Sequence, residues 1–367
     1  MDLVGNHLND APVQDLTHRS AQEPACGENR IRVTVGIKSL NEEAHIGAAL
    51  SSALAAVGKV GGEVVLADSG STDRTLEIAR QYPVRTVQLA NTAERSCGAG
   101  AQLAFQQARG EYFYILDGDM VLDPDFLPAG IAYLEANPDV AAVGGIVTEC
   151  NVSGEEFQIR SRATRSGRSW RPGLVDRLDC GGLFRTSAVR ETGYFADRNL
   201  HAFEELELAA RLASRGWKLA RIDTPAVNHF GHAANGYRLL WRRMRSGYSG
   251  AAGEVLRGAI GRPHLPIVLA RLGHVRNGIC IMLWWLALLA SLIGFRSILI
   301  SLMLVMAPIG FLILRRGSIR LGLYSFVAWN VSALGLLTGL SRRRVPPDQP
   351  LASIDLTISG AAHADLE

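Results

Sequence analysis

Three kinds of signature are missing from this sequence, and each absence removes a class of protein. No Gly-x-Gly-x-x-Gly follows the first expected strand and no Walker A sequence occurs, which argues against a dehydrogenase and a P-loop enzyme. The five cysteines are scattered without a Cys-x-x-Cys pair, which argues against a zinc ribbon or a disulfide framework and fits a reducing compartment. A formal net charge of only +3 does not indicate a nucleic-acid partner for the chain as a whole.

The two ends of the chain lack the patterns of folded segments. Residues 1–30 are polar and contain no apolar core, so we expect a disordered N-terminal segment rather than a signal peptide. Residues 342–367 follow the last apolar run, and we expect them to form a disordered tail.

Strand and helix patterns alternate after the N-terminal segment. Four apolar runs predict strands at residues 31–37, 63–67, 84–89 and 112–116. The alternation predicts an α/β fold with a parallel sheet and right-handed crossovers, whose ligands bind at the carboxyl ends of the strands. Four polar residues stand at these ends: Lys38, Asp68, Asp117 and Asp119.

The tripeptide Asp117-Gly118-Asp119 ends the fourth expected strand. Side chains two residues apart share a face of an extended chain, so both carboxylates can converge on one point, and Gly118 lets the backbone bend and leaves room for a ligand. Hard oxygen donors at this place suit a divalent cation that holds phosphates. An ordinary Asp-Gly turn with solvated carboxylates is the alternative for the tripeptide alone.

Five blocks of the sequence, in order, resemble glycosyltransferase family 2, the inverting GT-A fold. The blocks are VGIKSLNEEAHIGAAL, EVVLADSGSTDRTLEIA, RSCGAGAQLAFQQARGEYFYILDGDM, DCGGLFRTSAVRETGYF and HAFEELELAARLASRGWKLARI. The resemblance extends over residues 31–235 and implies a Rossmann-like, nucleotide-diphospho-sugar transferase domain there.

The resemblance also implies a donor site. Asp68 would hydrogen-bond the nucleotide base, uracil or guanine, although it could instead begin an Asx turn with Ser71. The backbone near Ser39, Asn41 and Glu43 would line the nucleoside. Asn41 and Glu43 are equally compatible with a role as helix caps, Asn41 being a good N-cap for the first helix.

The same resemblance assigns a metal site. Asp117 would hold the ribose or a metal-bound water, and Asp119 would coordinate Mg²⁺ or Mn²⁺ between the two phosphates. His229 falls where relatives often place a further metal ligand. His232 is a rival for that role, and either histidine could instead be structural.

The acceptor side is expected at the start of a helix near residue 204. Glu205 stands where the family usually has the aspartate that acts as catalytic base, so the carboxylate is retained with one more methylene. Gly181, Gly182 and Glu204 belong to the acceptor-side blocks. Glu207 and Arg211 are spaced for a structural i,i+4 ion pair.

An arginine run lies between the two halves of the site. Its members are Arg160, Arg162, Arg165, Arg168, Arg171 and Arg177. A solvated loop and a mobile loop that grips an anionic acceptor, such as a lipid diphosphate, are both compatible with this pattern.

The C-terminal third of the chain predicts contact with a membrane. Residues 236–277 are basic and amphipathic, which suits an anionic membrane surface. Residues 278–341 contain three apolar runs and predict two or three transmembrane helices, buried soluble helices being the alternative. Arginine clusters follow both the second and the third run, which conflicts with the positive-inside rule unless the third run is re-entrant or interfacial.

These observations predict a metal-dependent, inverting glycosyltransferase of the cytoplasmic membrane whose catalytic domain faces the cytosol. It would move a single sugar from a nucleotide-diphosphate sugar, a UDP-sugar being favoured, to a lipid-linked or glycan acceptor in polysaccharide or glycolipid synthesis. No Gln-x-x-Arg-Trp element occurs near Trp241, so processive polymerisation is not expected. A polyprenyl-phosphate sugar transferase and a catalytically silent membrane scaffold are the rival hypotheses.

Overall fold

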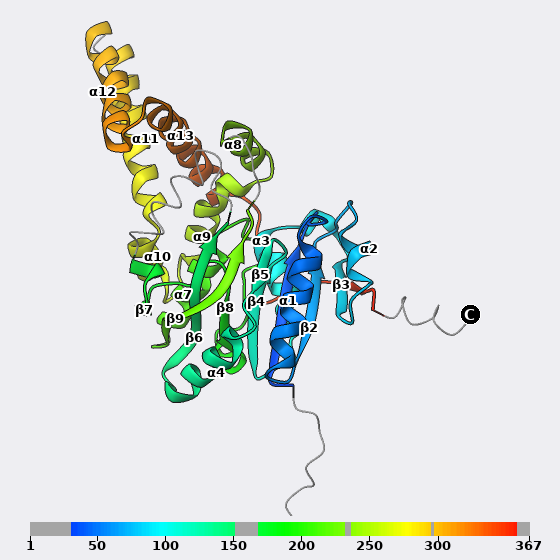
Figure 1. Ribbon diagram of the computed structural model, residues 1–367. Coiled ribbons are helices and arrows are strands. Elements are labelled where there is room, and N and C mark those ends of the chain that lie inside the picture. The colour runs from blue at the N-terminus through cyan, green and yellow to red at the C-terminus, as the bar shows by residue number, and fades with distance from the viewer. Residues whose placement is uncertain (1–30, 151–167, 232–235, 295–296, 358–367) are drawn as a thin grey trace, which may run out of the picture. The chain divides into compact units, whose positions relative to one another are not determined.

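The computed structural model describes residues 31–150, 168–231, 236–294 and 297–357 (Figure 1). The segments expected to be disordered at 1–30 and 358–367 lie outside the described residues, as do His232 and the Arg160, Arg162 and Arg165 part of the arginine run. The described residues belong to one compact unit of the chain.

A mixed sheet forms the centre of this unit, with the strand order β10-β3-β2-β1-β4-β8-β6-β9-β5 and with β7 paired to β9. The strands are β1 (Val33–Ser39), β2 (Gly62–Asp68), β3 (Arg85–Leu89), β4 (Tyr112–Asp117), β5 (Met120–Leu122), β6 (Val140–Glu149), β7 (Gly173–Val175), β8 (Gly182–Arg185), β9 (Lys218–His229) and β10 (Ser353–Asp355). The predicted parallel arrangement is confirmed for β3, β2, β1 and β4. Beyond β4 the sheet is mixed, because β8 runs antiparallel to both β4 and β6.

Both faces of the sheet are buried, which explains the continuous apolar runs of its strands. In β4, Tyr112, Tyr114 and Leu116 belong to one core cluster, whereas Phe113 and Ile115 belong to the other. The helices of the catalytic region are α1 (Ile46–Gly58), α2 (Thr75–Ala79), α3 (Cys97–Gln106), α4 (Phe126–Ala136), α6 (Thr186–Glu191) and α7 (Glu204–Ala213), with 3-10 turns at η1 (Thr92–Glu94) and η2 (Arg168–Trp170).

The loop after β1 differs from its prediction. Asn41 does not cap α1, which begins at Ile46 after His45; its φ of 57° places it in the left-handed region. The Asn41 side chain instead accepts a hydrogen bond from the Thr72 backbone N–H at 2.8 Å. The N-cap prediction is wrong because the Asn41 side chain binds the neighbouring β2–α2 loop rather than the first turn of α1.

The chain continues through shorter helices into three long ones. The shorter elements are α8 (Gly236–Arg245), η3 (Tyr248–Gly250), α9 (Ala251–Ala259) and α10 (Leu265–Arg271). Within the described residues, three helices are long and apolar enough to cross a membrane: α11 (Gly273–Ile293), α12 (Ile298–Arg316) and α13 (Ile319–Ser341). Their apolar side chains are largely exposed on α11 and α12, as expected for helices that contact lipid.

The prediction of a disordered tail from residue 342 is wrong for residues 342–357. β10 adds to the edge of the sheet, pairing antiparallel with β3 from Ser353↔Leu89 to Asp355↔Val87. Arg344 contacts the buried Asp197 at 2.5 Å, and Leu351 is buried in one of the core clusters, so this segment is held by a charged pair and by an apolar anchor.

Candidate active site

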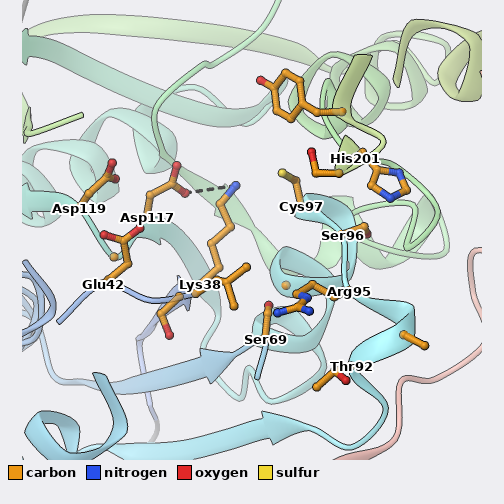
Figure 2. Close-up of a pocket in the computed structure, with 17 residues that line it drawn as sticks. Lys38, Glu42, Ser69, Thr92, Arg95, Ser96, Cys97, Asp117, Asp119 and His201 are labelled. Atoms are coloured by element: carbon orange, nitrogen blue, oxygen red, sulfur yellow. Dashed lines mark ion pairs between the residues drawn. The ribbon is translucent and has the colours of Figure 1, made fainter. Parts of the chain in front are cut away.

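A cavity of about 690 Å³ opens at the carboxyl ends of β1, β2 and β4, where the sequence predicts the ligand site (Figure 2). Of the predicted site residues, Ser39, Asp117 and Asp119 line it. Further lining residues come from the segment before α3 and from more distant loops: Thr92, Arg95, Ser96, Cys97, His201, Ser246 and Tyr248. The last two follow α8, so the segment that leads to the long apolar helices contributes to the cavity wall.

Lys38 is the cation at the centre of this site. Its ammonium nitrogen lies 3.2 Å from Asp117 Oδ1, the ion pair dashed in Figure 2, and 2.8 Å from Glu204 Oε1. Burial alone would lower the pKa of Lys38, but Asp117, Glu204 and Glu205 outweigh this effect and raise the pKa well above its ordinary value. Lys38 is therefore a fixed positive charge between Asp117 and Glu204.

The turn at Gly118 depends on the absence of a side chain. A Cβ at this position would lie 2.9 Å from Glu42 Cγ, and the Gly118 N–H donates to the Lys38 carbonyl oxygen at 3.0 Å. The close approach of Glu42 fixes the bend that follows β4. Burial and the charge of Asp119 raise the pKa of Asp117, while Lys38 opposes the shift.

Asp119, which directly precedes β5, forms a connected row with His229 on β9 and Glu149 on β6. Pairing of β9 with β5 places His229 opposite Met120, and pairing of β9 with β6 places it opposite Glu149. His229 Nε2 lies 3.3 Å from Asp119 Oδ2, and His229 Nδ1 lies 2.7 Å from Glu149 Oε2. Burial alone would lower the pKa of His229, but its hydrogen bonds with Asp119 and Glu149 raise the pKa to about 9.

This row offers a metal an oxygen and a nitrogen ligand. The Asp119 carboxylate and the imidazole Nε2 face one another, a donor pair that suits Mn²⁺ and, through the carboxylate, Mg²⁺. Glu149 takes the other ring nitrogen, the arrangement by which a carboxylate fixes the orientation of a metal-binding histidine. Cys180 Sγ lies within 4.8 Å of the Glu149 and His229 ligand atoms.

α7 begins with Glu204 and Glu205, as predicted. The preceding residue, Phe203, lies in the left-handed region with a φ of 66°. Both glutamates line a small hollow next to the main cavity, and Lys38 and Asp117 border both spaces. Burial and the negative charge of Glu204 raise the pKa of Glu205 to about 8, although Lys38 opposes the shift. The predicted ion pair between Glu207 and Arg211 is confirmed at 2.8 Å, which accounts for Glu207 as a structural residue.

The loop before β8 forms another wall of the small hollow. Cys180 and Gly181 both have positive φ, 64° and 93°, and a Cβ at Gly181 would lie 2.9 Å from the Ile115 carbonyl oxygen. Gly181 lines the hollow, whereas Gly182 is buried as the first residue of β8, paired with Ile115.

Three predicted nucleoside-binding residues line neither the large cavity nor the small hollow. Asp68 is fully buried and accepts hydrogen bonds from the backbone N–H groups of Gly70 and Ser71 at 2.8 Å, which is the Asx-type turn that the sequence left as the alternative. Asn41 accepts from Thr72, and Glu43 Oε2 accepts from the Arg74 N–H at 3.1 Å. Direct contact of these three with a nucleoside stays a prediction.

The sequence did not predict the contacts of two residues in the site, Lys38 and Glu149. Lys38 was visible as a strand-end residue, but its pairing with Glu204 arises from the fold alone. Glu149 offered no local signal, because only the β6–β9 pairing brings it to His229. Arg177 of the arginine run pairs with Asp179 at 2.8 Å, next to the acceptor-side loop.

Comparison with known proteins gives consistent matches. Residues 34–193 match the model of the family described as "Glycosyl transferase family 2". The chain is 28% identical over 166 residues to EpsE of Bacillus subtilis, covering 42% of this chain and 58% of that protein. It is 28% identical over 115 residues to a dolichol-phosphate mannosyltransferase of Pyrococcus furiosus, covering 30% of this chain and 32% of that protein. The chain thus spans between a third and somewhat over half of these relatives' length.

A solved structure extends the likeness to the fold. The mannosyltransferase PcManGT of Pyrobaculum calidifontis, in complex with GDP-Man and Mn²⁺, superposes with a TM-score of 0.57 at 22% identity, covering 84% of this chain and 87% of that chain. The predicted α/β, GT-A-like architecture followed by apolar C-terminal helices is confirmed.

Proposed function

We propose that this chain, whose residues 34–193 match the model of glycosyl transferase family 2, is a glycosyltransferase that uses a nucleotide sugar and moves a single sugar per encounter onto an acceptor held in a membrane. The reaction is inverting and metal-dependent, belongs to polysaccharide or glycolipid synthesis, and uses a UDP-sugar as the favoured donor. The observation that carries this proposal is the pair Lys38 and Asp117, which borders both the large cavity and the hollow containing Glu205.

Glu205 is the catalytic base of the proposed reaction. It takes the proton of the acceptor hydroxyl while that oxygen bonds to the anomeric carbon, and the bond from this carbon to the diphosphate oxygen breaks. Attack from the face opposite the leaving group inverts the configuration. Burial and Glu204 raise the pKa of Glu205 to about 8, which makes its carboxylate a stronger base than an ordinary glutamate, and the ionised fraction that accepts the proton grows as the pH rises toward this value.

Asp119 and His229 would hold Mg²⁺ or Mn²⁺, with Glu149 orienting the histidine. A cation bound there would offset the charge of the departing diphosphate. Lys38 supplies a second, permanent positive charge beside Asp117, at the junction of donor and acceptor spaces. Asp68 supports the donor pocket through the turn it stabilises, and base recognition by its carboxylate would require it to exchange a present hydrogen-bond partner.

The membrane-proximal helices favour a membrane-held acceptor. Ser246 and Tyr248 line the cavity directly after α8, a basic helix that exposes Trp241 (60%) and Tyr237 (43%). Aromatic and basic side chains together suit the interface of an anionic leaflet. Nucleotide sugars are cytosolic, so we place the enzyme in the cytoplasmic membrane with its catalytic domain facing the cytosol.

The test is turnover by the purified full-length chain in lipid nanodiscs. UDP- and GDP-sugars are screened for Mn²⁺-dependent release of nucleotide in the presence of membrane lipid extract, and the products are sized with labelled donor. One shifted product that requires metal and lipid supports the proposal, whereas a ladder of added sugars overturns single-residue transfer. Absence of release with every donor would favour the silent scaffold.

A polyprenyl-phosphate acceptor is the second candidate, favoured by the similarity to the dolichol-phosphate mannosyltransferase. Its attacking atom is a phosphate oxygen that is already ionised, so no base has to remove a proton. Glu205→Gln would then retain most of the transfer rate to polyprenyl phosphate, whereas transfer to a hydroxyl acceptor would fall steeply.

A further inference from the structure

The helical region α11–α13 begins and ends against the catalytic domain. α11 follows directly on α10, which packs on α7 and is anchored by Arg271, whose guanidinium lies 3.0 Å from both the backbone oxygen and the carboxylate of Asp176. After α13 the chain returns as β10 to the edge of the catalytic sheet. Both ends of the helical region are therefore fixed to the same body.

Charged contacts hold the returning segment in place. Arg342 pairs with Glu254, which also binds His201 at 2.9 Å, and Arg344 pairs with Asp197 at 2.5 Å. Glu254 and Asp197 are buried, so each depends on its cationic partner. Arg198 adds hydrogen bonds to the backbone oxygens of residues 349 and 350 at 2.9 and 3.2 Å. Residues 342–357 thus form a strap across the catalytic domain.

Three full crossings are incompatible with this arrangement. An odd number of crossings would place the start of α11 and the end of α13 on opposite faces of a bilayer whose hydrocarbon core is about 30 Å thick. The strap requires both ends on one face. The helical region must therefore cross an even number of times.

α13 is the helix that does not have the surroundings of a membrane-crossing helix. A Cβ at Gly335 would lie 2.0 Å from the Ser249 carbonyl oxygen, and one at Gly339 would lie 2.0 Å from the Gly250 carbonyl oxygen. Its last turns therefore pack backbone to backbone against η3 at the start of α9, outside the apolar helices. The apolar window of α13 is 39% buried within the protein, against 11% for those of α11 and α12.

α13 is also steeply inclined to α11, as Figure 1 shows. Phe326 contacts Trp284 with ring centroids 5.8 Å apart, and Leu336 fills the space beside Gly278. Phe326 and Leu336 are separated by about 15 Å of helix, whereas their partners on α11 are separated by only about 9 Å. The unequal separations show that α13 is not parallel to the axis of α11. A helix that lies obliquely at the membrane surface has this inclination.

α11 and α12 have the features of a crossing hairpin. Ser291 Oγ and Ser301 Oγ lie 2.8 Å apart near the connection, and Trp284 Nε1 donates to the Leu304 carbonyl oxygen at 2.8 Å. At 1.5 Å per residue the two helices are about 31 and 28 Å long, close to the thickness of the hydrocarbon core.

We propose that α11 and α12 cross the bilayer as a hairpin and that α13 returns along the membrane surface on the catalytic side. The proposal rests on the membrane location proposed above. Both arginine clusters, at 315–320 and 342–344, then lie on the face that carries the basic helix α8. The conflict with the positive-inside rule disappears, because no crossing separates the clusters. The occupant of the exposed apolar surface is the bilayer, with an anionic leaflet facing the exposed Arg315, Arg320 and Arg343.

Single-cysteine labelling of the full chain tests this topology without requiring activity. The five native cysteines are replaced, and Ser297→Cys, Ser318→Cys and Asp348→Cys are probed with a membrane-impermeant maleimide in intact and in permeabilised bacterial cells. Asp125→Cys, on the catalytic domain, is the reference for the cytosolic side. Sedimentation of the protein with carbonate-washed membranes separately tests its membrane location.

We expect Ser297→Cys to react in intact cells, and Ser318→Cys and Asp348→Cys to react only after permeabilisation, as the reference does. Reaction of Asp348→Cys in intact cells would show three crossings and overturn the proposal. Reaction of Ser318→Cys in intact cells, or protection of Ser297→Cys, would overturn the hairpin. Loss of the protein from washed membranes would instead overturn the membrane location on which the topology rests.

Discussion

The Lys38 ammonium nitrogen lies 2.8 Å from Glu204 Oε1, so one ion pair joins the end of the first strand to the start of the helix that carries the proposed base. Lys38 also contacts Asp117, at 3.2 Å. The cation thereby connects the donor-side carboxylates to the acceptor side, and its charge acts on the neighbouring Glu205.

Lys38→Gln is expected to lower transfer at pH 7 by about tenfold and to move the pH dependence of kcat/KM to higher pH. Removal of the positive charge lets burial and Glu204 raise the pKa of Glu205 further, so less of the base is ionised. Lys38→Arg should restore most of the wild-type profile, and Lys59→Gln, at an exposed ion pair, is the matched control. An unchanged pH profile in Lys38→Gln would show that Lys38 does not act on the base.

Glu205→Gln removes proton acceptance at nearly constant volume. We expect the rate of transfer to a hydroxyl acceptor to fall by about 10²–10⁴-fold, with little change in donor affinity, because Glu205 lines the hollow on the acceptor side. Single-turnover kinetics and calorimetric donor titration separate the two quantities. Glu77→Gln on the exposed surface of α2 serves as control, and a parallel collapse of donor binding would contradict the assignment.

The pH dependence of the wild-type enzyme follows from the same residue. A base works in its deprotonated form, so kcat/KM should rise with pH and level off above the pKa of Glu205, which burial and Glu204 raise to about 8. Activity should therefore be largely lost at pH 6, where an ordinary glutamate would still be ionised. A profile that is flat from pH 5.5 to 9 would contradict this role.

Asp119→Asn is expected to abolish Mn²⁺-dependent transfer while leaving the fold intact, since the residue lies at a strand end facing the cavity. Chelation of the metal from the wild-type enzyme should have the same effect on rate, and added Mn²⁺ should reverse it. The measurements are turnover and thermal stabilisation by nucleotide plus Mn²⁺. Asp125→Asn, on the surface, is the control; near-normal turnover by folded Asp119→Asn would exclude the metal assignment.

Arg344→Met tests the strap through stability. Asp197 is 1% exposed, and removal of its cationic partner leaves a buried charge, which typically costs about 3 kcal/mol. We expect a clear decrease in the thermal midpoint of the protein in nanodiscs. Arg343→Met changes an exposed neighbour and should have almost no effect; equal midpoints for the two variants would show that the strap contributes little.

The sequence was most informative where local pattern and burial coincide. The strands β1 to β4 are apolar because both faces of the sheet are covered. The polar residues that follow each apolar run mark where the strands end. Glu205 and Asp119 could be located because each stands in a short block that resembles the family.

Contacts between distant segments could not be predicted. Glu149 reaches His229 only through strand pairing, and Lys38 reaches Glu204 only through the packing of α7 on the sheet. The prediction of a disordered tail fails for the strap because the partners of its arginines, the buried Asp197 and Glu254, lie far away in the sequence. Asn41 has the residue type of a helix cap, but the competing donor, the Thr72 backbone N–H, is invisible in the local sequence.

The position of β10 has a consequence for the order in which this protein is made. The outer edge of β3 stays open until the ribosome has passed residue 355, and by then α11, α12 and α13 have all been synthesised. The catalytic domain can complete its sheet only after its apolar helices have been synthesised. A nascent chain delayed at that stage presents an unpaired strand edge, the kind of surface that pairs with other chains. On the membrane location proposed above, the apolar helices are therefore available for insertion before the closing step of folding.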